Sequence, residues 1–122
     1  MNLLNPMIKK VLGREGEEAA AHYLEKKGYK ILERNYRWRR GEIDIICKKK
    51  SLIIFVEVKT RRSLLFGDPL EAVDRRKQRQ ILKVAEKYLV TKKLYGKLDC
   101  RFDVITFKNN EIEHIEDAFR VE

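Results

Sequence analysis

Two acidic residues and a lysine interrupt the most apolar segments of this sequence, and they are the residues best suited to chemistry. Glu57 and Lys59 lie two apart in the run Leu52 to Thr60, so on a strand both side chains leave the same face. Asp44 lies in a second apolar run, with Glu42 two residues before it. Because burying such charges is costly unless they are paired, hydrogen-bonded or metal-bound, the pattern predicts a functional site.

The chemistry of this site depends on whether its two carboxylates meet. A hairpin turn at Lys48 to Ser51 would place Asp44 and Glu57 on adjacent strands. Two neighbouring carboxylates raise each other's pKa unless a divalent cation lies between them, and oxygen ligands suit Mg²⁺ or Mn²⁺ better than zinc. With a phosphate bound to the cation, Lys59 can orient a water molecule or stabilise developing charge, which predicts phosphodiester hydrolysis. The alternative is a same-face Glu57–Lys59 ion pair without catalytic work.

The charge balance indicates a polyanionic partner. The chain has 28 basic and 19 acidic residues, a net charge of +9, and 39% charged residues. A surface of this kind binds nucleic acid through release of counterions. Its 122 residues suffice for one core, so we expect a single domain over 1–122, with 1–12 as a flexible N-terminal arm.

Three basic clusters flank the predicted site in the sequence, and arginine side chains suit phosphate groups. The first cluster, Arg34 to Arg40, also contains Tyr36 and Trp38, and exposed rings of this kind can stack on unpaired bases. No groove-reading motif is present, so we expect recognition of backbone and shape. The alternative, a solvated charged face, is the better interpretation for Lys48–Lys50 and Lys92–Lys93. The predicted nucleic-acid contacts are Arg37, Arg39, Arg40, Arg61, Arg62, Arg75, Arg76 and Lys77. Lys77 either points outward or reaches toward the site.

Apolar periodicity predicts the elements that must position these residues. A first helix is expected from about Gly16 to Lys27, and Asn5-Pro6 is a plausible earlier cap and first helical position, although Gly13 and Gly16 weaken the segment that follows. A second helix is expected from Asp68, where a capping box begins, to about Lys93. Strands are expected at 30–38, 42–47, 52–60, 101–107 and 111–116. The third run is apolar on both faces, as a central strand is. The order αβββαββ predicts the α/β or α+β class, with two helices packed on a mixed sheet.

The cysteines, the histidines and the lack of a long apolar run indicate where the protein functions and which other sites it lacks. Cys47 and Cys100 form no C-x-x-C pair, so neither a disulfide framework nor a zinc site is expected. Because the sequence shows no signal-peptide core and no apolar run that spans a bilayer, we expect a cytoplasmic protein without a membrane partner. His22 and His114 are isolated and flanked by acids, which favours solvated side chains.

Several short blocks together resemble a known family. The blocks are Gly13-x-x-Gly16-Glu17-x-x-Ala20, Asn35-Tyr36-Arg37, Gly41 to Ile46, Phe55 to Arg61 and Arg101 to Val104. Their combination is similar to the YraN-like family of bacterial proteins, a nuclease-like branch of the PD-(D/E)xK restriction-endonuclease-like superfamily related in fold to archaeal Holliday junction resolvases. The superfamily's proline before the first acid is replaced by Ile43.

This resemblance implies a restriction-endonuclease-like mixed sheet with Asp44 and Glu57 as metal ligands and Lys59 as the catalytic lysine. It adds Glu17 as a helix acid of the site, and helical phase agrees, because Glu17 shares a face with Ala20 and Leu24. The implied function is a Mg²⁺-dependent, structure-selective endonuclease for branched or single-stranded DNA, working as a homodimer. The alternative is a non-catalytic nucleic-acid-binding or adaptor protein that keeps the fold. The role of Glu42 stays open.

Overall fold

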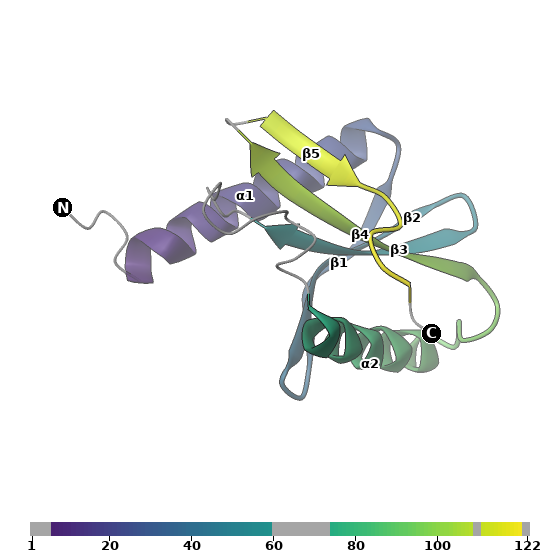
Figure 1. Cartoon of the computed structure of the whole chain (residues 1–122). Coiled ribbons are helices and arrows are strands. Elements are labelled where there is room, and N and C mark those ends of the chain that lie inside the picture. Colours follow the sequence, from purple (N-terminus) through teal and green to yellow (C-terminus); the bar gives the residue numbers. More distant parts are fainter. Residues whose placement is uncertain (1–5, 60–73, 109–110, 121–122) are drawn as a thin grey trace.

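A five-stranded sheet forms the centre of the computed structural model, which describes residues 6–59, 74–108 and 111–120 (Figure 1). The elements are α1 (Pro6–Lys26), β1 (Lys30–Trp38), β2 (Gly41–Lys49), β3 (Leu52–Lys59), α2 (Arg75–Thr91), β4 (Asp99–Lys108) and β5 (Glu111–Ile115). The strands lie in the order β1-β2-β3-β4-β5; only β3 and β4 are parallel. The predicted αβββαββ order and mixed sheet are therefore confirmed.

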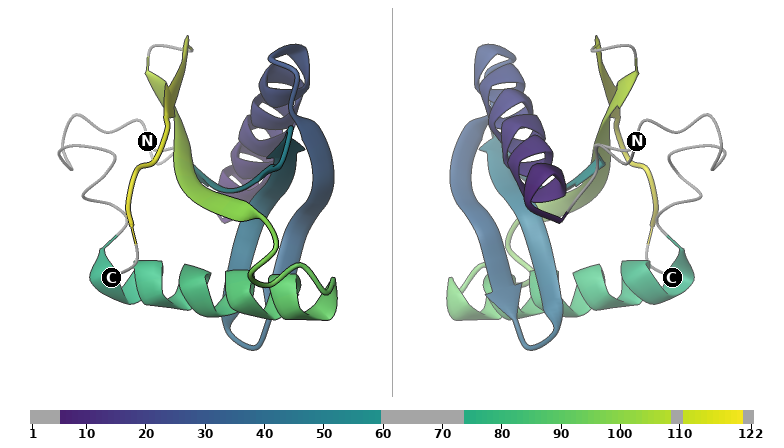
Figure 2. Two further views of the ribbon diagram at one scale, coloured as in Figure 1. Left: turned by 90° about the vertical axis from the view of Figure 1, so that its right-hand side faces the viewer. Right: turned by 90° about the vertical axis from the view of Figure 1, so that its left-hand side faces the viewer.

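The central position of β3 follows from its apolar residues. Ile53 and Phe55 belong to a buried cluster beneath α2, whereas Ile54 and Val56 belong to a second cluster beneath α1. The two helices thus pack on opposite faces of the sheet (Figure 2). Burial of alternate residues on both faces explains why this strand reads as an uninterrupted apolar run.

Both helices begin at other residues than the periodicity predicted. Helix α1 starts at Pro6, the earlier of its two possible starts, and not at Gly16. Proline suits a first helical position because its missing N–H would have no helical partner there. Gly16 is buried within α1, and packing of the helix onto the sheet outweighs the poor helix propensity of glycine.

Helix α2 starts later than predicted, at Arg75. Its N-cap is Asp74, which has an extended backbone (φ −70°, ψ 175°). The Asp74 side chain accepts the Lys77 N–H at 2.9 Å, so the helix begins directly after Asp74. The capping box predicted at Asp68 to Glu71 therefore does not begin α2, and it lies outside the described residues. Neither helix, as far as the chain is described, is long and apolar enough to span a membrane.

Candidate functional site

Asp44 and Glu57 lie opposite each other at the point where β2 and β3 diverge. The paired register ends with Ile45 opposite Val56, so the next step along both strands sets Asp44 opposite Glu57. The Asp44 Oδ2 atom accepts the backbone N–H of Val58 at 2.8 Å, which gives this N–H a side-chain partner at the end of the ladder. The antiparallel pairing confirms the predicted hairpin and brings the two predicted carboxylates together.

The regular alternation of side chains breaks at Asp44. Ile43 and Ile46 both pack into the cluster beneath α2, although strict alternation would put residues three apart on opposite faces. Ile45 packs into the cluster beneath α1. At this break the negative charges of Glu57 on β3 and of Glu17 on α1 both raise the pKa of Asp44. The site therefore forms where the sheet departs from regular geometry.

Two lysines converge on Glu57, whose residue surface is only 7% exposed. The Lys59 Nζ atom lies 3.5 Å from Glu57 Oε1, as expected for two residues on the same strand face. The Lys77 Nζ atom, which comes from the first turn of α2, lies 3.8 Å from the same oxygen. Of the two orientations considered for Lys77, the structure shows the one that reaches toward the site. The predicted ion pair between Glu57 and Lys59 is therefore part of a larger charged cluster.

The surroundings of both carboxylates disfavour their ionised form. Burial raises the pKa of Asp44 to about 7, and repulsion from Glu57 acts in the same direction. Burial also raises the pKa of Glu57, although the positive charges of Lys77 and Lys59 oppose the shift. A bound cation would relieve this cost, because it stabilises both carboxylates in their ionised form.

Asn35 on β1 links Glu17 on α1 to Glu42 on β2, two residues before Asp44. With the Asn35 amide nitrogen turned toward the two acids, it donates to Glu17 Oε2 at 3.0 Å and to Glu42 Oε1 at 3.1 Å. Asn35 has a left-handed backbone (φ 52°), a conformation that asparagine tolerates better than most residues. Glu42 also pairs with Arg37 at 3.4 Å. Sequence reasoning gave Asn35 no role, although asparagine inside a strand is itself an unusual choice.

The donor set suits a hard divalent cation with several remaining positions for water or substrate. In the ranges 6–59, 74–108 and 111–120, no three His, Cys, Asp or Glu side chains are grouped so that they could hold a metal ion by themselves. Asp44 and Glu57 offer only carboxylate oxygens. Mg²⁺ commonly takes one or two protein carboxylates and completes its shell with water and phosphate oxygens. The residues therefore fit Mg²⁺ better than a closed structural metal site.

Four of the arginines predicted to bind nucleic acid are exposed in the β1–β2 turn and in the first turn of α2. Arg39 and Arg40 are exposed in the β1–β2 turn, and the Arg39 guanidinium stacks 4.5 Å from the centroid of the Trp38 ring. The second aromatic of this segment, Tyr36, packs edge-on against Tyr88 at 5.2 Å. Its ring contributes to the core beneath α2.

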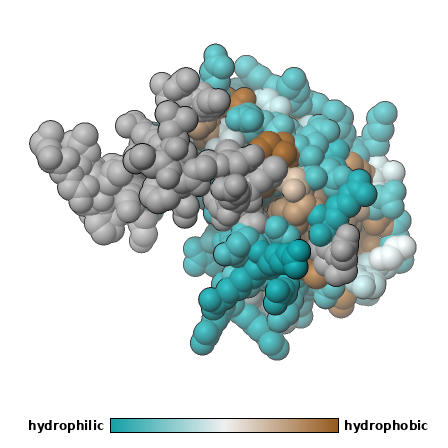
Figure 3. All heavy atoms as spheres, in the orientation of Figure 1, coloured by the Kyte–Doolittle hydropathy of each residue, from teal (hydrophilic) through white to brown (hydrophobic). Residues whose placement is uncertain are grey.

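The start of α2 presents a second basic surface. Arg75 and Arg76 are exposed in its first turn, directly before Lys77. Figure 3 shows hydrophilic side chains over this helix. The two remaining predicted contacts, Arg61 and Arg62, lie outside the described residues.

A second polar cluster, which sequence reasoning missed, surrounds the fully buried Asp103 on β4. Arg101 donates to both of its oxygens at 2.8 Å, His114 Nε2 lies 2.7 Å from Oδ2, and the backbone N–H of Asp117 donates at 3.0 Å. Burial alone would raise the pKa of Asp103, but the hydrogen bonds to His114 and Arg101 lower it. The solvated side chain predicted for His114 is therefore wrong, since only 6% of it is exposed. His114 lies on β5 and Asp103 on β4, so no short sequence motif contains both residues.

Comparison with known proteins finds close relatives without a named activity. A model described as "Uncharacterised protein family UPF0102" matches residues 16–107. The UPF0102 protein from Syntrophotalea carbinolica is 50% identical over 115 residues, which cover 91% of this chain and 93% of that protein. Similar proteins from Chlorobium phaeobacteroides and Persephonella marina are 48% and 46% identical, and cover 92% and 93% of this chain and 95% and 97% of their own lengths.

Proposed function

This chain belongs to the uncharacterised protein family UPF0102, and from the chemistry of its site we propose that it is a Mg²⁺-dependent DNA endonuclease of the PD-(D/E)xK type. One observation carries the proposal: Asp44 and Glu57 are brought together at the end of adjacent strands, with Lys59 and Lys77 on Glu57. A protein that only binds nucleic acid needs basic surface, but it has no use for costly buried carboxylates beside it.

Asp44 and Glu57 are the residues that would hold the cation, with Glu17 as an outer acid whose charge acts on Asp44 and which Asn35 links to Glu42. When bound, Mg²⁺ supplies the positive charge that polarises a phosphate oxygen and lowers the pKa of a water molecule. The carboxylates are half-buried and buried, so their orientation is set before any ligand arrives. The hydrogen bond from Val58 further fixes Asp44.

The lysines supply the remaining charge. The Lys59 side chain is 17% exposed and lies on the same strand face as Glu57, so its ammonium can donate to an attacking water or to a phosphate oxygen. The Lys77 side chain is 38% exposed and lies at the end of α2 that carries Arg75 and Arg76. We assign Lys77 to charge balance at Glu57 and to contact with the phosphate being cleaved.

Recognition of DNA by backbone and shape follows from the distribution of basic residues. Arg39, Arg40, Arg75 and Arg76 are exposed arginines whose forked donors suit phosphate groups. The resemblance to junction resolvases extends the proposal to branched or single-stranded DNA and to a homodimer.

The test is a cleavage panel of branched, single-stranded and duplex DNA, each with Mg²⁺, Mn²⁺ or EDTA. Asp44→Asn and Glu57→Gln keep side-chain shape and remove one charge, so we expect a loss of rate of at least roughly 10²-fold with DNA binding retained. Glu86→Gln, an exposed acid on α2, is the matched control and should cleave like the wild type. Binding to every DNA without cutting, whatever the metal or variant, would instead establish the non-catalytic binding protein.

A further inference from the structure

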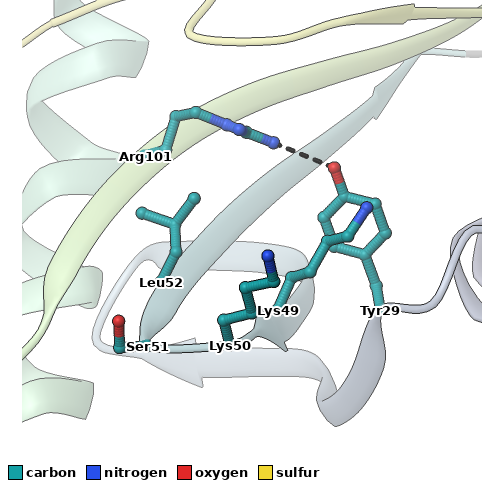
Figure 4. Close-up of a pocket in the computed structure, with 6 residues that line it drawn as sticks. All are labelled: Tyr29, Lys49, Lys50, Ser51, Leu52 and Arg101. Carbon is teal, nitrogen blue, oxygen red and sulfur yellow. Dashed lines mark hydrogen bonds between the residues drawn. The ribbon is translucent and has the colours of Figure 1, made fainter.

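A shallow pocket lies at the end of the β2–β3 hairpin opposite to the proposed catalytic site (Figure 4). It has a volume of about 360 Å³. The residues that line it are Tyr29, Lys49, Lys50, Ser51, Leu52 and Arg101. These described residues include three cations and no acid. Glu57 lies five positions after Leu52 on β3, which is about 17 Å along an extended strand.

Arg101 gives the pocket a fixed positive group. Two of its nitrogens donate to the buried Asp103 at 2.8 Å, and Nη2 also donates to the Tyr29 hydroxyl at 3.1 Å. Its Nη1 atom forms an exposed ion pair with Glu116 Oε2 at 3.7 Å, a distance beyond that of a hydrogen bond. The guanidinium is therefore immobilised by its buried partner while Nη1 keeps donor capacity for a ligand. A pre-positioned donor of this kind binds an anion with little further loss of entropy.

The two lysines bring mobile charge to the same space. The Lys49 amino group lies 4.7 Å from the centroid of the Tyr29 ring. The Lys50 amino group points toward the space between Arg101 and Leu52 in Figure 4. Lys50 also adopts a left-handed backbone (φ 56°), where glycine would be less strained. The turn thus has a lysine at a position where the backbone conformation favours glycine.

We propose that this pocket binds a phosphate group, with Arg101 as the fixed donor and Lys49 and Lys50 as neutralising cations. A phosphate has several oxygens that accept hydrogen bonds together, which matches amino, guanidinium and Ser51 hydroxyl donors on one side. The sequence alone favours a solvated face for the lysines, because Arg101 and Tyr29 come from distant parts of the chain. The pocket stands apart from the proposed cleavage, since it shares no residue with that site.

The first experiment titrates inorganic phosphate into the full chain in EDTA at constant ionic strength, followed by the amide NMR signals of Lys50, Ser51 and Leu52. Lys50→Gly removes the ammonium and relieves the left-handed backbone, so the variant should fold at least as stably as the wild type. Lys93→Gly is the matched control, because Lys93 has the same conformation (φ 59°) and does not line the pocket. We expect saturable shifts in the wild type and the control, and roughly five-fold weaker binding in Lys50→Gly.

A second arm identifies the source of the phosphate with a 5′-phosphorylated and a 5′-hydroxyl single strand of one sequence, again in EDTA. Tighter binding of the phosphorylated strand that Lys50→Gly abolishes assigns the pocket to terminal phosphates. Equal weakening of both strands assigns it to the DNA backbone, and weakening for inorganic phosphate alone assigns it to a free phosphate compound. Only the choice of DNA rests on the proposed function. Identical phosphate binding by Lys50→Gly and Lys93→Gly would overturn the proposal, and it would leave metal-dependent cleavage untouched.

Discussion

Replacing Asp44 with asparagine should stabilise the metal-free protein at neutral and alkaline pH. Burial and the neighbouring Glu57 raise the pKa of Asp44 from its ordinary value of 3.8 to about 7. The folded protein therefore retains a proton that the unfolded chain releases, and wild-type stability falls as the pH rises through this window. Asparagine does not titrate, and its oxygen can still accept the Val58 N–H that Asp44 accepts at 2.8 Å. The difference in stability between variant and wild type should therefore grow with pH and level off above about pH 7.

The size of this effect follows from the shift. About three pKa units, each worth ~1.36 kcal/mol, set an upper bound of about 4 kcal/mol. Because Asp44 is only half-buried and shares its titration with Glu57, we expect roughly 2 kcal/mol at about pH 8. For a domain of this size that corresponds to a rise in Tm of roughly 8 °C. Mg²⁺ should raise the Tm of the wild type and leave that of the variant nearly unchanged.

The assay is thermal and urea denaturation in EDTA at several values between about pH 5 and pH 8.5, repeated with Mg²⁺. Asp99→Asn serves as the control, since Asp99 is exposed at the start of β4 and should change stability little at any pH. A difference between Asp44→Asn and wild type that stays constant across this range would refute the electrostatic reasoning. So would a variant less stable than the wild type at the alkaline end.

Three further predictions test other contacts. Lys59→Met should slow metal-dependent cleavage by roughly 10²- to 10³-fold and change DNA affinity only a few-fold, as single-turnover and binding assays would measure. Asp103→Asn should destabilise the fold by roughly 2–3 kcal/mol in urea denaturation, less than a wholly buried pair because Arg101 keeps some solvent contact. Gly41→Ala should cost about 1–3 kcal/mol, because its new methyl group would collide with Val84 Cγ2. Adding Val84→Ala should then recover part of that loss, and purely additive effects would contradict the clash.

The strands could be predicted from the sequence because buried strands appear as short runs of apolar residues. The predicted strands end within two residues of the observed ends of β1 to β5. The helix boundaries were less predictable. Pro6 and Asp74 decide where α1 and α2 begin, but Gly16 and the competing cap at Asp68 carried equally good local signals. Which of two adequate caps is used depends on how the whole helix packs.

The candidate site divides in the same way. Asp44, Glu57 and Lys59 stood out because charges inside apolar strands need partners, whatever the remainder of the fold. Asn35 and the Asp103–His114 pair did not, because a single asparagine, aspartate or histidine in a strand has many harmless explanations. Their roles come from hydrogen bonds between strands, which single-sequence periodicity does not report.

The buried charges of the site were thus determined by the sequence itself: two acids and a lysine on β2 and β3, in segments too apolar to leave them unpaired. Tertiary structure alone decided what meets them. The packing of α2 on the sheet sets Lys77 3.8 Å from Glu57, 20 residues away in the chain. The packing of α1 on the other face of the sheet brings the charge of Glu17 close enough to act on Asp44. Local patterns fix which side chains are buried, but convergence depends on the relative placement of elements, which is set by the free energy of the complete core.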